Sequence, residues 1–241
     1  MSLKTQLQQK VSEYLKGNYT TYEPRAIPEP QEIPLGNQAA KLEATALFID
    51  IRQSSNIANA FRLQTAAKMV KAYFDGAVRI IGHNSGRVRS FNGDGMLALF
   101  LGDQRFHNAV KAAMQVEWFA GNILRPRLDG YFENNRAAMG QRLVFEIGCG
   151  LDDSSIFAVR VGIRGTNDVA WVGKGTNTAA KLASKVSQPQ SIGITREIYS
   201  HLDRSYKYDM YGAHMWSEED PEEIGGQVRA IRTTSYWSVI S

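Results

Sequence analysis

Cysteine is nearly missing from this sequence: Cys149 is the only one among 241 residues, so no disulfide bond can form within the chain. That usage is typical of a reducing compartment. The sequence also has no run of about 18 apolar residues, which excludes an ordinary membrane-spanning helix. Its N-terminus lacks the apolar core of a signal peptide. We therefore expect a soluble, cytoplasmic protein without a membrane partner.

A large excess of charge of one sign is also missing. The 28 basic residues exceed the 24 acidic ones by a net charge of +4, and they are scattered along the chain. This balance permits a polyanionic ligand but gives no reason to expect nucleic acid as a partner. Hydrophobic residues make up 43% and charged residues 22%, as in ordinary globular domains. The chain is long enough to bury a sizeable core.

The first 40 residues differ in character from the rest. Residues 3–16 carry an apolar side chain at every fourth position, which predicts a short amphipathic helix closed by Gly17. Residues 22–36 hold four of the seven prolines and are typical of an extended connector. We therefore divide the chain into an N-terminal helix and proline-rich connector, residues 1–40, and a main domain, residues 41–241.

Apolar periodicity in the main domain predicts alternating strands and helices, which is typical of an α/β or α+β sheet domain. The expected helices are residues 56–81, 106–124 and 175–186. The expected strands are residues 44–51, 87–92, 96–101, 143–151, 157–164, 168–172, 190–194 and 228–239. Residues 125–141 are polar, with one proline and two glycines, and are expected to be rich in loop.

Two aspartates stand where predicted strands end. Asp94 lies within SFNGDGMLALF, between two glycines that indicate a tight hairpin turn, and Asp50 ends the first strand of the main domain. A strand–helix–hairpin order allows the hairpin to pair beside the first strand and bring the carboxylates together. Two like charges are unfavourable side by side unless a cation binds between them, and Mg²⁺ prefers a few carboxylate oxygens with substrate phosphates. From these residues alone, a simple Asp-Gly turn and a metal site both remain open.

Three segments resemble the signature motifs of the class III nucleotidyl cyclases, in that family's order. They are ALFIDIRQSSNIA, FNGDGMLALF and VGKGTNTAAKLAS, and the resemblance covers residues 44–198. It implies an α+β fold of ferredoxin-like or palm type, with a central, mostly antiparallel sheet flanked by helices. It also implies a nucleoside triphosphate substrate and two divalent metal ions, Mg²⁺ or Mn²⁺, as cofactors. Diguanylate cyclases of the GGDEF type share the two-metal principle, but their signature string is not present.

The resemblance assigns the metal side of the site to the first strand and the hairpin. Asp50 and Asp94 match the two metal-binding acids, and Ile51 matches the residue that lends a backbone carbonyl. The backbone amides that follow would lie beneath the triphosphate, where donors suit anionic oxygens. These amides belong to the segment of Gln53, Ser54 and Ser55.

The third motif supplies two further residues. Asn177 matches the residue that orients the ribose, and Lys181 stands where the family has an arginine that stabilises the transferring phosphate. Lysine keeps the charge but not the bidentate fork. A helix-capping asparagine and a solvated helix lysine are the plainer alternatives. Because the family draws its metal ligands and its Asn–Arg pair from different subunits, the resemblance implies a homodimer with composite active sites.

The positions that read the purine in this family carry no matching side chains here. They are Ser90, three residues before Gly93 of the hairpin, and Ala170, ahead of the third motif. Neither can make the purine contacts, and each buried base group left unpaired costs about 1–3 kcal/mol. Polar contacts to a uracil edge could come instead from Arg52, Gln53 or Arg89.

A chain that retains the two metal-binding acids but lacks the purine-contacting residues resembles the pyrimidine cyclases of Pycsar anti-phage defence. The resemblance implies conversion of UTP, or next CTP, to the 3′,5′-cyclic monophosphate and pyrophosphate, as a defence signal. An adenylate or guanylate cyclase with an atypical base pocket remains an alternative. So does a catalytically silent nucleotide-binding module of the same fold.

Overall fold

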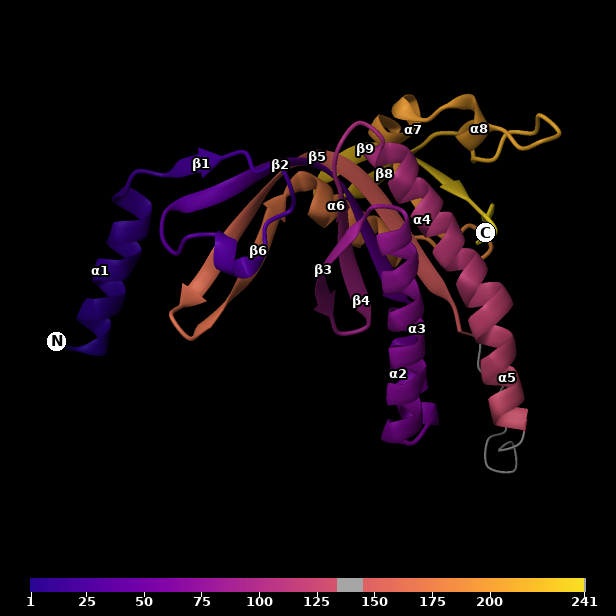
Figure 1. The fold of residues 1–241 in the computed structure, drawn as a ribbon, viewed down its shortest axis with the longest axis horizontal. Helices are drawn as coiled ribbons and strands as arrows, with labels where there is room; N and C mark the ends of the chain where they lie inside the picture. Colours follow the sequence, from indigo (N-terminus) through magenta and orange to yellow (C-terminus); the bar gives the residue numbers. More distant parts are fainter. Residues whose placement is uncertain (134–144, 241) are drawn as a thin grey trace.

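The computed structural model describes residues 1–133 and 145–240 (Figure 1). The strands in this part of the chain are β1 (Thr20–Tyr22), β2 (Gln38–Ile51), β3 (Arg87–Asn92), β4 (Gly95–Phe100), β5 (Ile147–Ile163), β6 (Thr166–Gly173), β7 (Ile192–Thr195), β8 (Asp220–Ile224) and β9 (Gln227–Thr234). They form one nine-stranded sheet with the order β3-β4-β2-β5-β7-β9-β8, while β1 pairs with β2 and β6 with β5. The pairs β1–β2 and β5–β7 are parallel and the others antiparallel.

Helices flank this sheet, so the predicted α+β class with a mostly antiparallel sheet is confirmed. The α-helices described are α1 (Leu3–Lys16), α2 (Ser54–Ala60), α3 (Leu63–His83), α4 (Arg105–Phe119), α5 (Arg125–Glu133), α6 (Lys174–Lys185), α7 (Arg196–His201) and α8 (Arg204–Lys207). A 3₁₀ turn spans Pro30–Glu32, and a π-turn spans Ala120–Leu124. Among these helices, none is long and apolar enough to cross a membrane.

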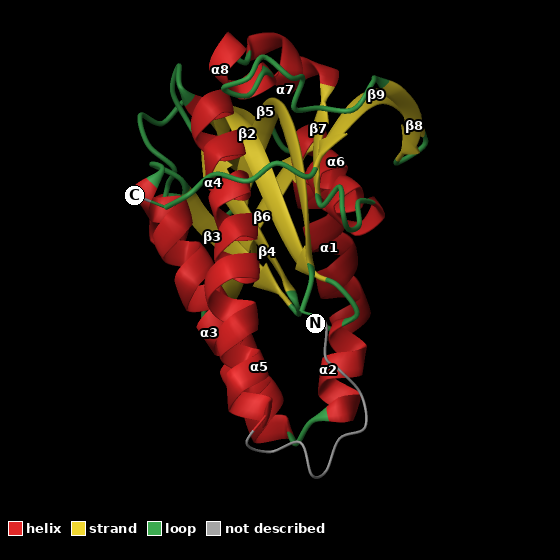
Figure 2. Ribbon diagram, turned by 90° about the vertical axis from the view of Figure 1, so that its right-hand side faces the viewer, coloured by secondary structure: helices red, strands yellow, loops and turns green. Residues whose placement is uncertain are grey.

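Strand β2 separates two cores. Leu47 and Ile49 are buried in the larger core with α3 and α4, whereas Ala46 lies in the smaller core with Ala179 of α6. Figure 2 shows α3, α4 and α5 on one side of the sheet and α6 on the other. Because side chains alternate along a strand, Asp50 points to the same side of the sheet as Ala46, the side that α6 covers.

The prediction of two strands over residues 143–151 and 157–164 is wrong. Residues Ile147–Ile163 form one strand of 17 residues, β5, which pairs along most of β2. Residues 143 and 144 lie outside the described part. The segment between the predicted strands, DDSSI, begins with four polar residues and resembles a turn. Such a segment can continue a strand when neighbouring elements supply partners for its side chains.

Those partners are present in the fold. The buried carboxylate of Asp152 accepts a hydrogen bond from Thr195 Oγ1 at 2.7 Å and pairs with Arg229 Nη2 at 2.8 Å. Burial raises the pKa of Asp152, while Thr195 and Arg229 act in the opposite direction. Asp153 pairs with Arg105 Nε at 2.8 Å. The acids that break the apolar pattern therefore tie β5 to β7, β9 and α4.

Two further predictions differ from the structure. The helix expected over residues 56–81 is divided into α2 and α3 at Phe61, whose backbone is extended (φ −122°, ψ 156°) and whose side chain packs against the larger core. Part of the expected loop is helical, because α5 continues α4. The π-turn ends at Leu124, two residues before Pro126, and accommodates this residue, which cannot donate the regular helical bond. Residues 134–141 of the expected loop lie outside the described part.

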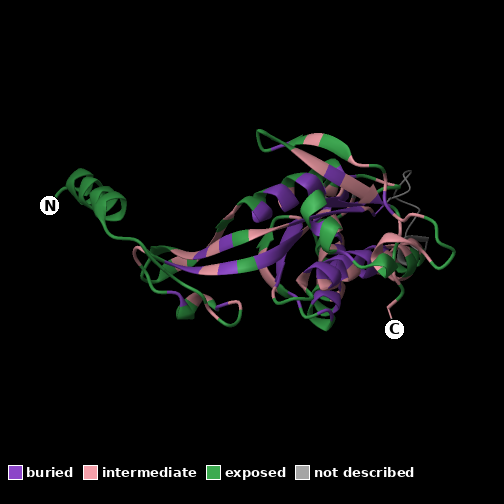
Figure 3. Ribbon diagram, turned by 90° about the horizontal axis from the view of Figure 1, so that it is seen from above, coloured by how far each residue is buried: buried purple, intermediate pink, exposed green. Residues whose placement is uncertain are grey.

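The N-terminal helix projects from the sheet. All residues of α1 are exposed (Figure 3). Its last turn is tied to the sheet by Asn37, whose side-chain amide donates to Tyr14 O at 3.0 Å. The connector is packed more firmly, because Ile33 is fully buried in the smaller core.

Candidate active site

The β3–β4 hairpin brings Asp94 to the end of β2. Gly93 takes a φ of +63°, a region that favours glycine, and this turn places Asp94 directly before β4. Strand β4 pairs with β2 so that Gly95 lies opposite Asp50. The backbone N–H of Ile51 donates to Asp94 O at 3.3 Å. The structure therefore brings the two predicted acids to the same end of the sheet.

These two carboxylates disfavour each other. Partial burial raises the pKa of Asp50, the neighbouring Asp94 raises it further, and Arg52 acts in the opposite direction. Asp94 also accepts a hydrogen bond from Ser54 Oγ. Among the described residues, no group of three or more His, Cys, Asp or Glu side chains gathers to hold an ion. A pair of hard carboxylates fits a divalent ion such as Mg²⁺, which takes its remaining ligands from water and substrate phosphates.

The chain turns sharply after β2 and presents backbone amides beside the acids. Gln53 adopts a left-handed conformation (φ 52°, ψ 36°), and α2 begins at the next residue. Ser54 and Ser55 are the first residues of that helix, where backbone N–H groups have no acceptor within the helix. The amides that the motif predicts for phosphate contact therefore lie at a free helix end, next to Asp94.

Arg52 connects this end of the sheet to α6. Its Nη1 donates to Ser184 O at 2.7 Å, near the end of that helix. Its Nε and Nη2 are buried without a hydrogen-bond partner among the described residues. A Cβ on Gly148 would lie 2.9 Å from Nη2, so the guanidinium packs directly on the glycine backbone. The sequence pattern offered Arg52 as a base contact and did not indicate this link.

Asn177 and Lys181 lie on the exposed face of α6. Together with Lys174 they line a shallow pocket of about 150 Å³, whose far wall includes Ile224 and Gly225 from the turn between β8 and β9. Gly225 has a φ of +65°, and a Cβ there would lie 2.9 Å from Lys181 Nζ. A bare backbone turn thus fits against the lysine.

The described pocket that Asn177 and Lys181 line does not include Asp50 or Asp94. Asp50 and Asp94 lie at the ends of β2 and β4, whereas the pocket of Asn177 and Lys181 reaches the β8–β9 turn at the opposite edge. Strand β9 is three positions from β2 in the sheet, which corresponds to about 14 Å at the usual strand spacing. The acids therefore meet at the end of β2, while Asn177 and Lys181 meet in a pocket whose lining includes neither acid.

The residues predicted around the base lie on separate strands. Ser90 is partly buried on β3, near the hairpin, while Ala170 lies on β6 opposite Val159, in the outer half of β5. Arg89 pairs with Glu29 of the connector, with 3.0 Å between Nη2 and Oε1 and 13% of its side chain exposed. In this conformation Arg89 contacts the connector.

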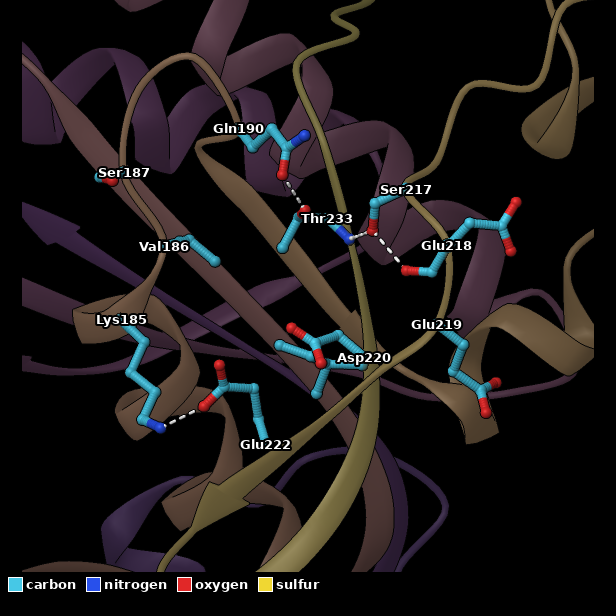
Figure 4. A pocket seen from close by; sticks show the side chains of 11 residues that line it. Lys185, Val186, Ser187, Gln190, Ser217, Glu218, Glu219, Asp220, Glu222 and Thr233 are labelled. Carbon is cyan, nitrogen blue, oxygen red and sulfur yellow. Dashed lines mark hydrogen bonds and ion pairs between the residues drawn. The ribbon is translucent and has the colours of Figure 1, made fainter.

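A larger cavity, of about 550 Å³, contains none of the predicted site residues (Figure 4). Four acidic side chains line it, Glu218, Glu219, Asp220 and Glu222, and its one lysine, Lys185, is paired with Glu222. Because a surplus of carboxylates repels a triphosphate, size alone does not identify the nucleotide site.

The fold resembles solved nucleotidyl cyclases. A bacterial light-regulated adenylyl cyclase has a TM-score of 0.67 at 17% identity, over 96% of this chain and 63% of that one. The guanylyl cyclase Cya2 has a TM-score of 0.66 at 16% identity, over 83% of this chain and 95% of that one. These likenesses, with the hairpin and its acids, define the class III nucleotidyl cyclase fold.

Sequence relatives narrow that class. A uridylate cyclase of Xanthomonas perforans is 32% identical over 219 residues, which cover 90% of this chain and 91% of the relative. A uridylate cyclase of Burkholderia cepacia is 28% identical over 241 residues, which cover 99% and 100%. No family model matches the chain. The chain belongs to the family of nucleotidyl cyclases that these bacterial uridylate cyclases represent.

Proposed function

We propose that this chain is a uridylate cyclase, which converts UTP to 3′,5′-cyclic UMP and pyrophosphate and accepts CTP less well. The observation that carries the proposal is the meeting of Asp50 and Asp94 at one end of the sheet, in a chain 32% identical to a named uridylate cyclase. Ser90 and Ala170 support a pyrimidine, because neither offers the purine contacts of the wider family.

In the proposed reaction the ribose 3′-oxygen forms a bond to the α-phosphorus, the bond to pyrophosphate breaks, and the hydroxyl proton passes to solvent. Asp50, Asp94 and the carbonyl of Ile51 would hold two Mg²⁺ or Mn²⁺ ions. When bound, such ions lower the pKa of the 3′-hydroxyl and neutralise the triphosphate. The amides of Gln53, Ser54 and Ser55 face the phosphate oxygens.

The residues of α6 complete the site from a second copy of the chain. Asn177 orients the ribose for in-line attack, and Lys181 neutralises charge on the transferring phosphate. Their pocket lies apart from the acids of the same chain, which supports a homodimer with two composite sites. Each site then joins the acids of one protomer to α6 of its partner.

The cyclic nucleotide acts, in this proposal, as a cytoplasmic second messenger of anti-phage defence. This part rests on the resemblance to the Pycsar cyclases and on the relatives named uridylate cyclase. It needs neither nucleic acid nor a membrane as a partner.

Product analysis tests the proposal. The purified chain is incubated with Mn²⁺ and ATP, GTP, CTP or UTP in turn, and Asp94→Asn prepared in parallel controls for a contaminating cyclase. We expect cyclic UMP as the main product, with less cyclic CMP, and none from the variant. Cyclic AMP or cyclic GMP as the main product would identify a purine cyclase instead.

A catalytically silent nucleotide-binding module is the second candidate, because Lys181 replaces the arginine of the family. The same experiment separates the two. No product from any of the four nucleotides, with UTP binding retained, would favour the silent module.

A further inference from the structure

The first residue of α6 is a lysine that the proposed reaction has not used. Lys174, Asn177 and Lys181 follow one another along the same exposed face, and all three line the same shallow pocket. Within the described part of the chain, neither lysine has an ion-pair partner among the salt bridges of the fold. The side-chain amide of Asn177 thus lies between two ammonium groups without ion-pair partners in that part of the chain, those of Lys174 and Lys181.

Helix stability does not account for Lys174. The N-terminal end of a helix carries partial positive charge, so a cation there is unfavourable and an acid is preferred. The first turn of α6 contains no acid, and its N-cap, Gly173, offers no side-chain hydrogen bond. A residue that breaks a local rule without a compensating contact is typical of a functional site.

The order of side chains along α6 indicates what Lys174 would contact. At 1.5 Å per residue, Lys174 lies about 4.5 Å before Asn177 along the helix axis, and Lys181 about 6 Å after it. If Asn177 holds the ribose and Lys181 the phosphate, as in the proposed function, the base extends toward Lys174. Ala170 lies on β6, just before this helix, and has no polar side chain to offer.

We propose that Lys174 donates a hydrogen bond to a carbonyl oxygen of the pyrimidine base and so contributes to the binding of UTP. This inference rests on the proposed function. An ammonium group donates but never accepts, so it suits the ring carbonyls of uracil and cytosine. It supplies a base contact from the α6 side of the composite site.

Steady-state kinetics of three variants test this role. Lys174→Met keeps the length of the side chain without its donor, Lys174→Arg keeps a donor, and Lys68→Met removes an exposed lysine of α3 as the matched control. We expect Lys174→Met to lower kcat/KM for UTP about 10- to 100-fold, mainly through KM, since hydrogen bonds to charged groups have this strength. Lys174→Arg should recover part of the loss, and Lys68→Met should match the wild type.

Inhibition by inorganic tripolyphosphate separates base recognition from phosphate binding. If Lys174 contacts the base, the inhibition constant is the same in the wild type and in Lys174→Met. An inhibition constant that weakens as much as KM for UTP would assign Lys174 to the triphosphate and overturn the proposal. Equal UTP kinetics in Lys174→Met and Lys68→Met would overturn it as well.

Calorimetric binding of UTP, with Ca²⁺ in place of Mn²⁺, keeps this inference distinct from the proposed reaction. If the wild type makes no cyclic nucleotide but binds UTP, and Lys174→Met binds it at least tenfold more weakly by the criterion above, the reaction fails and the role of Lys174 stands. A wild type that binds no pyrimidine nucleotide contradicts both.

Discussion

Asp50 carries a carboxylate that the folded chain holds partly buried and beside that of Asp94. Because its pKa is raised above the unfolded value, the folded state binds more protons between those two pKa values. Its contribution to the free energy of unfolding is therefore most favourable at low pH and is lost as the pH rises through that window. At neutral pH, without a metal ion, the ionised group opposes folding.

The variant Asp50→Asn should therefore separate stability from activity. In EDTA at pH 7 we expect a melting temperature higher than that of the wild type, with the difference shrinking as the pH falls toward about 4. Mn²⁺ should raise the melting temperature of the wild type by mass action and leave the variant unchanged. Cyclase activity should fall about a hundredfold or more, the scale of a lost electrostatic stabiliser.

Asp103→Asn, at an exposed position between β4 and α4, is the control for both measurements. It should keep the activity and the Mn²⁺ response of the wild type. An Asp50→Asn variant that stays active, or that melts below the wild type in EDTA, would contradict the assignment of Asp50 as a metal ligand.

At the scale of elements, α6 rests directly on the backbone of β5. A Cβ on Gly150 would lie 2.2 Å from Ala179 O and 2.4 Å from Ala183 N, and neither backbone atom can yield without moving the helix. Two glycines of β5, Gly148 and Gly150, thus set the depth at which α6 packs. They also set the position of Asn177 and Lys181, which α6 carries.

Gly150→Ala should consequently impair folding and catalysis together. We expect a loss of about 1–3 kcal/mol in the free energy of unfolding, as for other overpacked cores, measured by urea denaturation. The displaced helix should also lower kcat by up to about a hundredfold. Gly82→Ala is the matched control, because a Cβ on that glycine of α3 would have no neighbour within 4 Å. Equal effects of the two substitutions would show that β5 does not position α6.

The alternation of apolar and polar residues was sufficient to predict those elements whose own sequence carries a regular pattern. In the hairpin of Asp94, β3 spans the predicted residues 87–92. Strand β4, predicted over residues 96–101, begins and ends one residue earlier. Strand β2, in contrast, extends to Gln38, beyond the predicted start at residue 44. The order of these strands allowed their pairing and the meeting of the two acids, and the structure shows the pairing.

Features that depend on distant partners could not be predicted in this way. The continuity of β5 requires Arg229 and Arg105 to neutralise its buried acids, and those arginines follow from the tertiary fold. The last strand, predicted over residues 228–239, ends at Thr234. The elements β8, α7 and α8 are too short to show a clear apolar periodicity, and the sequence did not predict them. The link from Arg52 to α6 and the position of Lys174 beside Asn177 and Lys181 also needed the fold.

At the scale of the whole molecule, the separation of the acids from Asn177 and Lys181 has a direct test in mixed dimers. In the proposed homodimer, Asp94→Asn inactivates one half of each composite site, and an Asn177→Ala/Lys181→Ala double variant inactivates the other half. After subunit exchange, half of the dimers are mixed, and each contains one intact site. We expect about a quarter of wild-type activity from two inactive proteins, as two-fold symmetry requires.

Mixing Asp94→Asn with Asp50→Asn is the control for this experiment. Both lesions affect the same half of the site, so no mixed dimer contains an intact one, and no activity should return. Recovery in both mixtures, or in neither after subunit exchange is verified by mass spectrometry, would contradict a composite site.

The N-terminal helix offers a natural cleavage point. Its linkage to the sheet is short and exposed, and the buried residues of both cores begin only at Ile33. Trypsin should therefore cut after Lys16 under native conditions and release α1. The remaining protein retains every buried side chain of the two cores. Comparing trimmed and intact enzyme would then measure what α1 adds to assembly or turnover, without a change to a single residue of the catalytic domain.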